Sequence, residues 1–189
     1  MFDSNASYQD HHITVLPNRS RFQESVSRIL EHHAAGSRGS AVLHVTVQSF
    51  SGTGAVSMRL LNLTGVALRA AMRDGEVAYL GDAEFAVFLH DTDAREAAHY
   101  ARTVVGMVGS FRVEWQDQML SVSAHVGGVM ADDGVDGTAL LEKAIAASEA
   151  ASHKFGCKVH LTHSVTGAAA EPPEAATENR LLERIAAYA

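Results

Sequence analysis

A polar turn between two apolar stretches constrains the fold of this chain more than any other feature. Residues 76–79 are mainly apolar after Glu76, and residues 86–89 are all apolar. The six residues between them, 80–85, include Gly81 and Asp82, which are typical of a tight turn. This pattern predicts a β-hairpin whose second strand is buried, so the fold must contain at least one antiparallel strand pair.

The length and composition fit one folded domain with a short appendage. The chain has 189 residues, and 47% of them are hydrophobic, which is enough for a full core. No apolar run approaches the roughly 18 residues of a membrane span, and residues 1–10 lack the apolar segment of a signal peptide. We therefore expect a soluble domain.

The cysteine content and the net charge bear on the cellular location and on the classes of binding partner. Cys157 is the only cysteine, so an internal disulfide is excluded, which agrees with a reducing, cytoplasmic location. The net charge is −7, and lysine and arginine form no cluster. We therefore expect neither nucleic acid nor an anionic membrane as a partner, because both require a basic patch.

The spacing of apolar residues predicts the other elements. Helices are expected from Asn18 to about residues 34–36, over 56–72, from Asp93 onward and over 138–153. Asp93 and Glu96 fit a capping pair for the third of these helices. Strands are expected over 41–50, 111–115, 119–126 and 158–161. This order of elements belongs to the α/β (α+β) class, in which helices pack on a sheet.

The last part of the chain differs from the body. Residues 1–163 are expected to form the domain, and residues 164–174, which are rich in Ala, Gly and Pro, predict a linker. Residues 175–189 predict a final helix with Leu181, Leu182 and Ile185 on its apolar side. We expect this helix either to dock on the body or to lead into a further domain.

Five segments, in order, resemble the motifs of one family. Residues 13–22 resemble L-T-G-L-P-N-R-x-x-F, and residues 43–50 resemble a strand that ends D-x-D-x-F. Residues 81–85 resemble the GG(D/E)EF turn, residues 85–93 the strand and helix start after it, and residues 121–127 the T-x-S-x-G strand. Over residues 11–161 the chain is identified as a member of the GGDEF (diguanylate cyclase-like) family. The resemblance implies a nucleotidyl-cyclase-like, mostly antiparallel sheet of about five strands flanked by helices.

The same resemblance implies that the metal ligands are lost. Diguanylate cyclases join two GTP molecules with the help of divalent metal ions, which require hard oxygen ligands, chiefly carboxylates. The two aspartates of the family's first strand map to Thr46 and Gln48, and the catalytic acid of the turn maps to Ala83. None of these three side chains carries a negative charge. We therefore expect no metal site, no cofactor and no enzyme activity.

The nucleotide contacts are also altered. Gly81, Glu84 and Phe85 match the family's turn, but Asp82 replaces its second glycine, where a carboxylate adds bulk and repels an anionic ligand. Residues 51–58 are shorter than the family's guanine-binding segment and contain no Asn or Asp. Ser152 maps to the family's phosphate-contacting lysine, with Lys154 as a neighbouring substitute. Residues 72–75 lack the R-x-x-D pair of the family's product-inhibition site.

Three functions remain open. The first is an inactive domain that serves as a regulatory, dimerisation or protein-interaction module in bacterial cyclic-di-GMP signalling, with a protein partner, a homodimer, or a covalently linked EAL or sensory domain. The second is a non-catalytic receptor for GTP or cyclic-di-GMP, for which Arg59, Arg69 and Arg73 are candidate contacts, unless they form a solvated helix face. The third is a residual diguanylate cyclase.

Overall fold

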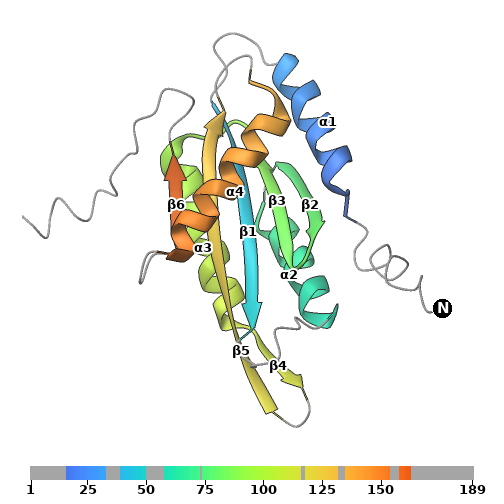
Figure 1. Cartoon of the computed structure of the whole chain (residues 1–189), viewed down its shortest axis with the longest axis vertical. Coiled ribbons are helices and arrows are strands. Elements are labelled where there is room, and N and C mark those ends of the chain that lie inside the picture. Colours follow the sequence, from blue (N-terminus) through green and yellow to red (C-terminus); the bar gives the residue numbers. More distant parts are fainter. Residues whose placement is uncertain are drawn as a thin grey trace, which may run out of the picture.

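The chain folds in the order of elements that its apolar spacing predicts. The computed structural model describes residues 16–32, 39–49, 58–72, 74–115, 118–131, 135–153 and 158–162. These residues form, in order, α1 (Arg19–Glu31), β1 (Ser40–Ser49), α2 (Met58–Ala71), β2 (Gly75–Gly81), β3 (Glu84–Leu89), α3 (Ala94–Ser110), β4 (Arg112–Trp115), β5 (Gln118–Ala131), α4 (Gly137–His153) and β6 (Val159–Thr162) (Figure 1).

The strands form one mixed sheet with β1 at its centre. The strand order is β2-β3-β1-β5-β4, every pair along this path is antiparallel, and β6 joins β5 in parallel. The start of β5 pairs with β4 and its later part pairs with β6, so the two short strands share one edge. The β4–β5 hairpin extends beyond the helices at one end of the molecule (Figure 1). The predicted α/β class with a mostly antiparallel sheet is confirmed.

The strand β5 is longer than predicted. The prediction ended it at Val126, before Gly127 and Gly128, but the strand continues to Ala131 because β1 pairs with both glycines. A Cβ atom at Gly127 would lie 1.9 Å from the backbone nitrogen of Ser148 in α4. Gly127 is therefore a site of close approach between a strand and a helix, and it does not end the strand.

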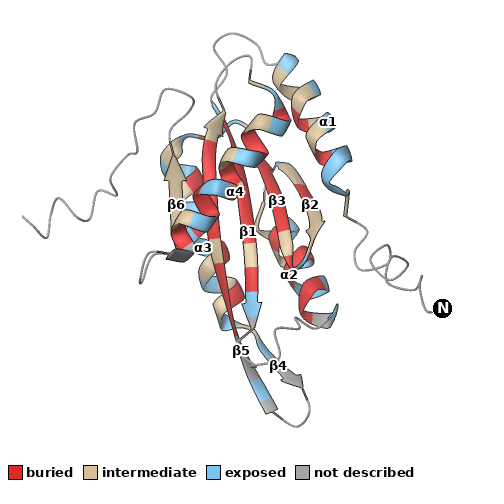
Figure 2. Ribbon diagram, viewed as in Figure 1, coloured by how far each residue is buried: buried red, intermediate tan, exposed pale blue. Residues whose placement is uncertain are grey.

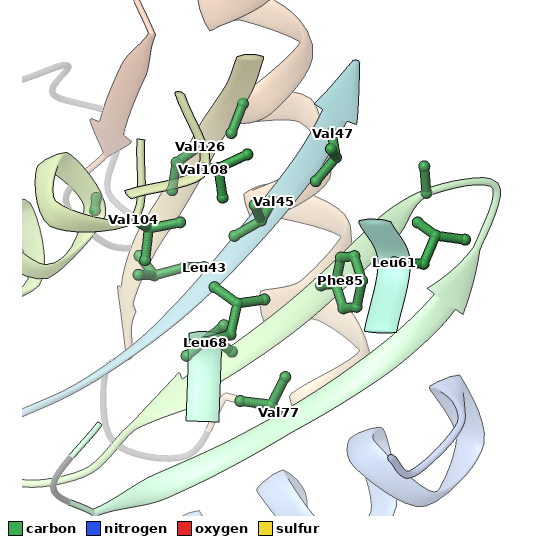
Figure 3. Close-up of a cluster of buried hydrophobic side chains, with 14 of the residues drawn as sticks. Leu43, Val45, Val47, Leu61, Leu68, Val77, Phe85, Val104, Val108 and Val126 are labelled. Carbon is green, nitrogen blue, oxygen red and sulfur yellow. The ribbon is translucent and has the colours of Figure 1, made fainter. Parts of the chain in front are cut away.

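Side chains of the sheet alternate between two helical layers. One apolar cluster lies between the sheet and the helices α2 and α3, and it includes Leu43, Val45, Phe85, Val104 and Val126 (Figure 3). The other lies between the sheet and the helices α1 and α4, and it includes Phe22, Val42, Phe88, Val129 and Leu140. The central strands are consequently buried on both sides (Figure 2). Consecutive residues of β1 and β3 thus face opposite helical layers.

Local signals set where the helices start and end. The side chain of Asn18 accepts a hydrogen bond from the backbone of Arg21 (3.0 Å) at the start of α1. The predicted pair at the start of α3 is a capping box: the side chain of Asp93 accepts from the backbone of Glu96 (2.8 Å), and the Glu96 side chain accepts from the backbone of Asp93 (3.1 Å). The helix α1 ends at Glu31, before the predicted end near residues 34–36, which lie outside the described residues.

The predicted linker 164–174 and helix 175–189 also lie outside the described residues, so the domain boundaries stay predictions. None of the helices in the described part of the chain has the length and apolar character needed to cross a membrane.

Candidate functional site

The predicted turn is a tight hairpin connection of two residues. Asp82 and Ala83 lie between β2 and β3, both with positive φ (48° and 65°), and Gly81 before them has φ 101°. Two successive residues with positive φ give a turn whose twist matches that of the flanking strands. Of the six residues predicted as turn, Gly81 ends β2 and Glu84 begins β3. The turn is therefore shorter than predicted.

The tip of this hairpin is attached to the central strand. The backbone N–H of Val47 in β1 donates to the carbonyl oxygen of Ala83 (3.0 Å). The Ala83 side chain is only 7% exposed and belongs to the apolar cluster under α2 and α3, together with Phe85. The position that the resemblance assigns to a catalytic acid is thus filled by a methyl group packed in the core.

The next residue, Glu84, belongs to the opposite side of the sheet. It is directly opposite Thr46 in the β1–β3 register, and Thr46 is directly opposite His125 in the β1–β5 register. The Thr46 hydroxyl lies 3.4 Å from the hydroxyl of Ser148 in α4, at hydrogen-bond distance. We call this region, between the sheet and α4, the polar face. Its residues are His44, Thr46, Gln48, Glu84, Ser123, His125 and Ser148.

A buried histidine contacts the one carboxylate on the polar face. Nε2 of His44 lies 3.3 Å from a carboxylate oxygen of Glu84, with exposed fractions of 2% and 32% for the two side chains. The contact has ion-pair distance but not hydrogen-bond geometry, and neither ring nitrogen of His44 has a hydrogen-bond partner among the described residues. Burial lowers the pKa of His44, against the opposing effect of Glu84; Arg19 lowers it further and Glu149 raises it. The imidazole is therefore neutral at pH 7.

Other polar groups of this face are buried without partners. Within the part of the chain that the structure describes, the hydroxyl of Ser123 and Nδ1 of His125 have no hydrogen-bond partner. Burial lowers the pKa of His125, and the positive charge of Lys158 lowers it further. In the part of the chain that the structure describes, no three His, Cys, Asp or Glu side chains lie close enough together to hold a metal ion. The polar face thus offers one carboxylate, neutral imidazoles and hydroxyls, a poor ligand set for Mg²⁺.

The structure brings together only some of the residues that sequence reasoning singled out. Thr46 and Glu84 meet on the polar face, and Gln48 is exposed near the end of β1. Ala83 packs in the other layer. Arg69 is exposed on α2, which covers the side of the sheet opposite the polar face.

Several predicted positions cannot be placed at the site. Arg73, Lys154 and the shortened segment 51–57 lie outside the described residues, and so do the side chains of Arg59 and Ser152. Sequence reasoning missed His44 and His125. A signal existed for His44, because it alternates with the polar residues Thr46 and Gln48 and is flanked by the apolar Leu43 and Val45.

Comparisons with known proteins agree on one family. The family model described as diguanylate cyclase, GGDEF domain, matches residues 7–156. No curated protein gives a significant match. Among solved structures, the diguanylate cyclase SiaD of Pseudomonas aeruginosa, in complex with its activator SiaC, matches with a TM-score of 0.69 at 22% identity. The match covers 81% of this chain and 60% of the SiaD chain, so this chain spans about 60% of that protein.

Two isolated domains match over nearly their whole length. The GGDEF domain of FimX from P. aeruginosa has a TM-score of 0.68 at 16% identity, over 80% of this chain and 97% of that one. The GGDEF domain of DgcB from Caulobacter crescentus, in complex with c-di-GMP, has a TM-score of 0.68 at 19% identity, over 85% of this chain and 96% of that one. At these identities the likenesses show a shared fold.

Proposed function

Because this chain belongs to the GGDEF domain family, we propose that it is a catalytically inactive member that acts as a regulatory or dimerisation module in bacterial cyclic-di-GMP signalling. It works through contacts with other proteins and synthesises no cyclic dinucleotide. A linked EAL or sensory domain, a second copy of the chain, or a separate protein is the partner.

One observation carries the proposal: Glu84, the carboxylate that this turn retains, faces a threonine and a histidine. Joining two GTP molecules requires divalent metal ions to activate a ribose hydroxyl and to neutralise phosphate charge. Thr46 is directly opposite Glu84, and the imidazole of His44 is 3.3 Å from it. A neutral imidazole and a hydroxyl supply no negative charge, so the polar face holds Mg²⁺ far more weakly than a pair of carboxylates would.

The position of Ala83 supports the same proposal. Its methyl group is packed under α2 and α3, on the side of the sheet away from Glu84. In this turn, a side chain that replaces the methyl group starts in the layer under α2 and α3, so a single substitution there does not rebuild a ligand pair with Glu84. Asp82, exposed at the tip, adds a negative charge that repels a nucleotide phosphate.

A role in protein contacts is supported by the intact scaffold. Apolar clusters lie on both sides of the sheet, and all six described strands join in it, while Glu84 is the one carboxylate among the residues of the polar face. SiaD, which shares the fold, has been solved in complex with a protein activator. Binding of another protein needs the folded surface and none of the catalytic groups.

The decisive experiment is calorimetric titration of the full chain with GTP and, separately, with cyclic-di-GMP, both with Mg²⁺ present. We expect no binding of either at micromolar concentrations. Micromolar binding that Glu84→Gln or Asp82→Gly alters would instead make the domain a nucleotide receptor at the polar face. Micromolar binding that Arg69→Ala weakens would make the domain a nucleotide receptor on α2.

Incubation with GTP and Mn²⁺, followed by chromatography, tests for residual catalysis, and any cyclic dinucleotide above the protein-free blank contradicts the proposal.

A further inference from the structure

The outward side of α2 is unusually apolar. Among the described residues, the exposed large hydrophobic side chains are Met58 (48%), Leu63 (44%), Val66 (69%) and Met119 (63%), and three of these four belong to α2. Leu63, Val66 and Ala70 follow the spacing i, i+3, i+7, so they line one side of the helix. We call these three residues the α2 stripe.

The opposite side of α2 is buried in the core of the domain. Leu60, Leu61 and Leu68 are buried in the apolar cluster that includes Phe85. Figure 3 shows Leu61, Leu68 and Phe85 in this cluster. A surface helix of a soluble domain normally has one apolar side and one polar side, and a helix that is apolar on both sides is normally covered on both. The α2 stripe therefore has the character of a helix-docking surface that the described residues leave open.

We propose that the α2 stripe is the docking site of residues 175–189 of the same chain. This segment contains Leu181, Leu182 and Ile185, a spacing that places the three side chains on one side of a helix. A helix–helix contact needs such a narrow apolar seam on each partner, and the α2 stripe supplies the other one. The α2 stripe is about two helical turns long, and the side chains from Leu181 to Ile185 cover about one of them.

Charge complementarity favours this occupant. The helix α2 contains Arg59 and Arg69 and no acidic residue. In the segment, Glu178 is one turn before Leu181 and Leu182, in line with the apolar side chains. Antiparallel docking brings Glu178 to the end of α2 that carries Arg69, whose side chain is exposed. Parallel docking would instead bring Glu178 to the end that carries Arg59, so charge favours this segment as the occupant in either direction. The charge exchange between Arg69 and Glu178 distinguishes the two directions.

The connection is long enough. The helix α3 packs against both β6 and α2, so the strand that precedes the tail and the helix that receives it are separated by about one helix. Residues 163–174 span up to roughly 40 Å when extended. This length exceeds the interaxial spacings of about 10 Å between α3 and its neighbours, so the tail can reach α2 within one chain.

Hydrogen exchange of the full chain, read by mass spectrometry over residues 175–189, tests the proposal. We expect exchange in this segment to be on the order of tenfold slower than in the isolated peptide. Val66→Glu should abolish the protection, because it places a charge at the centre of the α2 stripe. Met119→Glu is the matched control, since it adds the same charge at an equally exposed apolar residue on β5 and should leave the protection unchanged.

A charge exchange tests the direction of docking. Arg69→Glu should reduce the protection, and the double variant Arg69→Glu with Glu178→Arg should recover it. Exchange in the body, including β1, reports whether each variant is folded. Three outcomes overturn the proposal: peptide-like exchange of residues 175–189 in the unaltered chain, protection that survives Val66→Glu, or protection that appears only as light scattering detects a dimer. The last outcome would mean that a second copy occupies the α2 stripe.

Discussion

The backbone N–H of Val47 donates to the carbonyl oxygen of Ala83 over 3.0 Å, which joins the tip of the β2–β3 hairpin to the central strand. This hydrogen bond fixes the turn beyond the last β1–β3 residue pair, Thr46 and Glu84. The orientation of the turn is therefore set by the main chain of β1. The identity of the residue at position 83 then decides what enters the core under α2.

Ala83→Asp is expected to destabilise the domain and to restore no cyclase activity. The methyl group is 7% exposed among apolar side chains, and a carboxylate there loses hydration without gaining a partner, at a cost of about 1–3 kcal/mol. Urea denaturation measures this cost, and chromatography after incubation with GTP measures activity. Ala83→Gly is the control: it suits the φ of 65° and should change stability by less than about 1 kcal/mol. An Ala83→Asp variant with cyclase activity and unchanged stability would contradict both the packing of Ala83 in the core and the proposed lack of catalysis.

Gly127→Ala is expected to disrupt the contact between β5 and α4. The added Cβ would lie 1.9 Å from the nitrogen of Ser148 and 2.5 Å from the carbonyl oxygen of Ala144, so α4 must move away from the sheet. We expect a loss of about 3 kcal/mol or more in the free energy of unfolding. Gly106→Ala, in the exposed middle of α3 with open space around its Cβ, should instead stabilise the domain by up to about 1 kcal/mol. Equal effects of the two substitutions would contradict this view of Gly127.

His44 is expected to make the domain less stable in acid. Burial holds the pKa of His44 below the value of about 6.5 of an unfolded chain, so the unfolded state binds the proton first as the pH falls. The stability is complete above pH 6.5 and decreases as the pH falls from there toward the lower pKa of the folded state. Urea midpoints at pH 7.5 and 5.5 measure the change. His44→Gln should reduce it, whereas His32→Gln, at the exposed end of α1, should not.

Glu84→Gln is expected to lower the pKa of His44 further. The carboxylate is the largest influence that opposes the effect of burial on this imidazole, so its removal leaves burial and Arg19 less opposed. A pH titration of the His44 ring signals by NMR measures the shift. Glu149→Gln should move the same pKa in the same direction but less, since Glu149 has the smaller influence. A rise in the pKa of His44 on loss of Glu84 would contradict the 3.3 Å contact.

The elements that sequence reasoning predicted well are those with local signals. The capping box of Asp93 and Glu96 lies within one helical turn, and the alternation in β1 depends only on neighbouring residues. The contact of His44 with Glu84 was not predictable in this way, because it depends on the register between two strands that are 40 residues apart in the sequence. The continuation of β5 through Gly127 depends on α4, which no local pattern reports.

The sequence alone predicted which residues replace the family's acids at the candidate site. It did not predict on which side of the sheet each of these residues lies. Thr46 and Ala83 both stand at positions where the family has acids, and the sequence alone gave no reason to separate them. In the folded domain, Thr46 belongs to the polar face and Ala83 to the apolar cluster of the other layer. Which layer a side chain joins follows from strand register, a property of the whole sheet.

The length of the two-residue turn at Asp82 and Ala83 helps to set which side of the sheet each residue of β3 faces. If a residue inserted or deleted there shifted β3 by one position against β1, each side chain of β3 would exchange sides, sending Phe85 toward α4 and Glu84 into the apolar layer under α2. Substitutions at the tip leave each β3 side chain on its own side of the sheet, whereas such a shift in register does not. The length of this turn is therefore constrained by the packing of the whole β3 strand, whereas a side chain at the tip affects only its own surroundings.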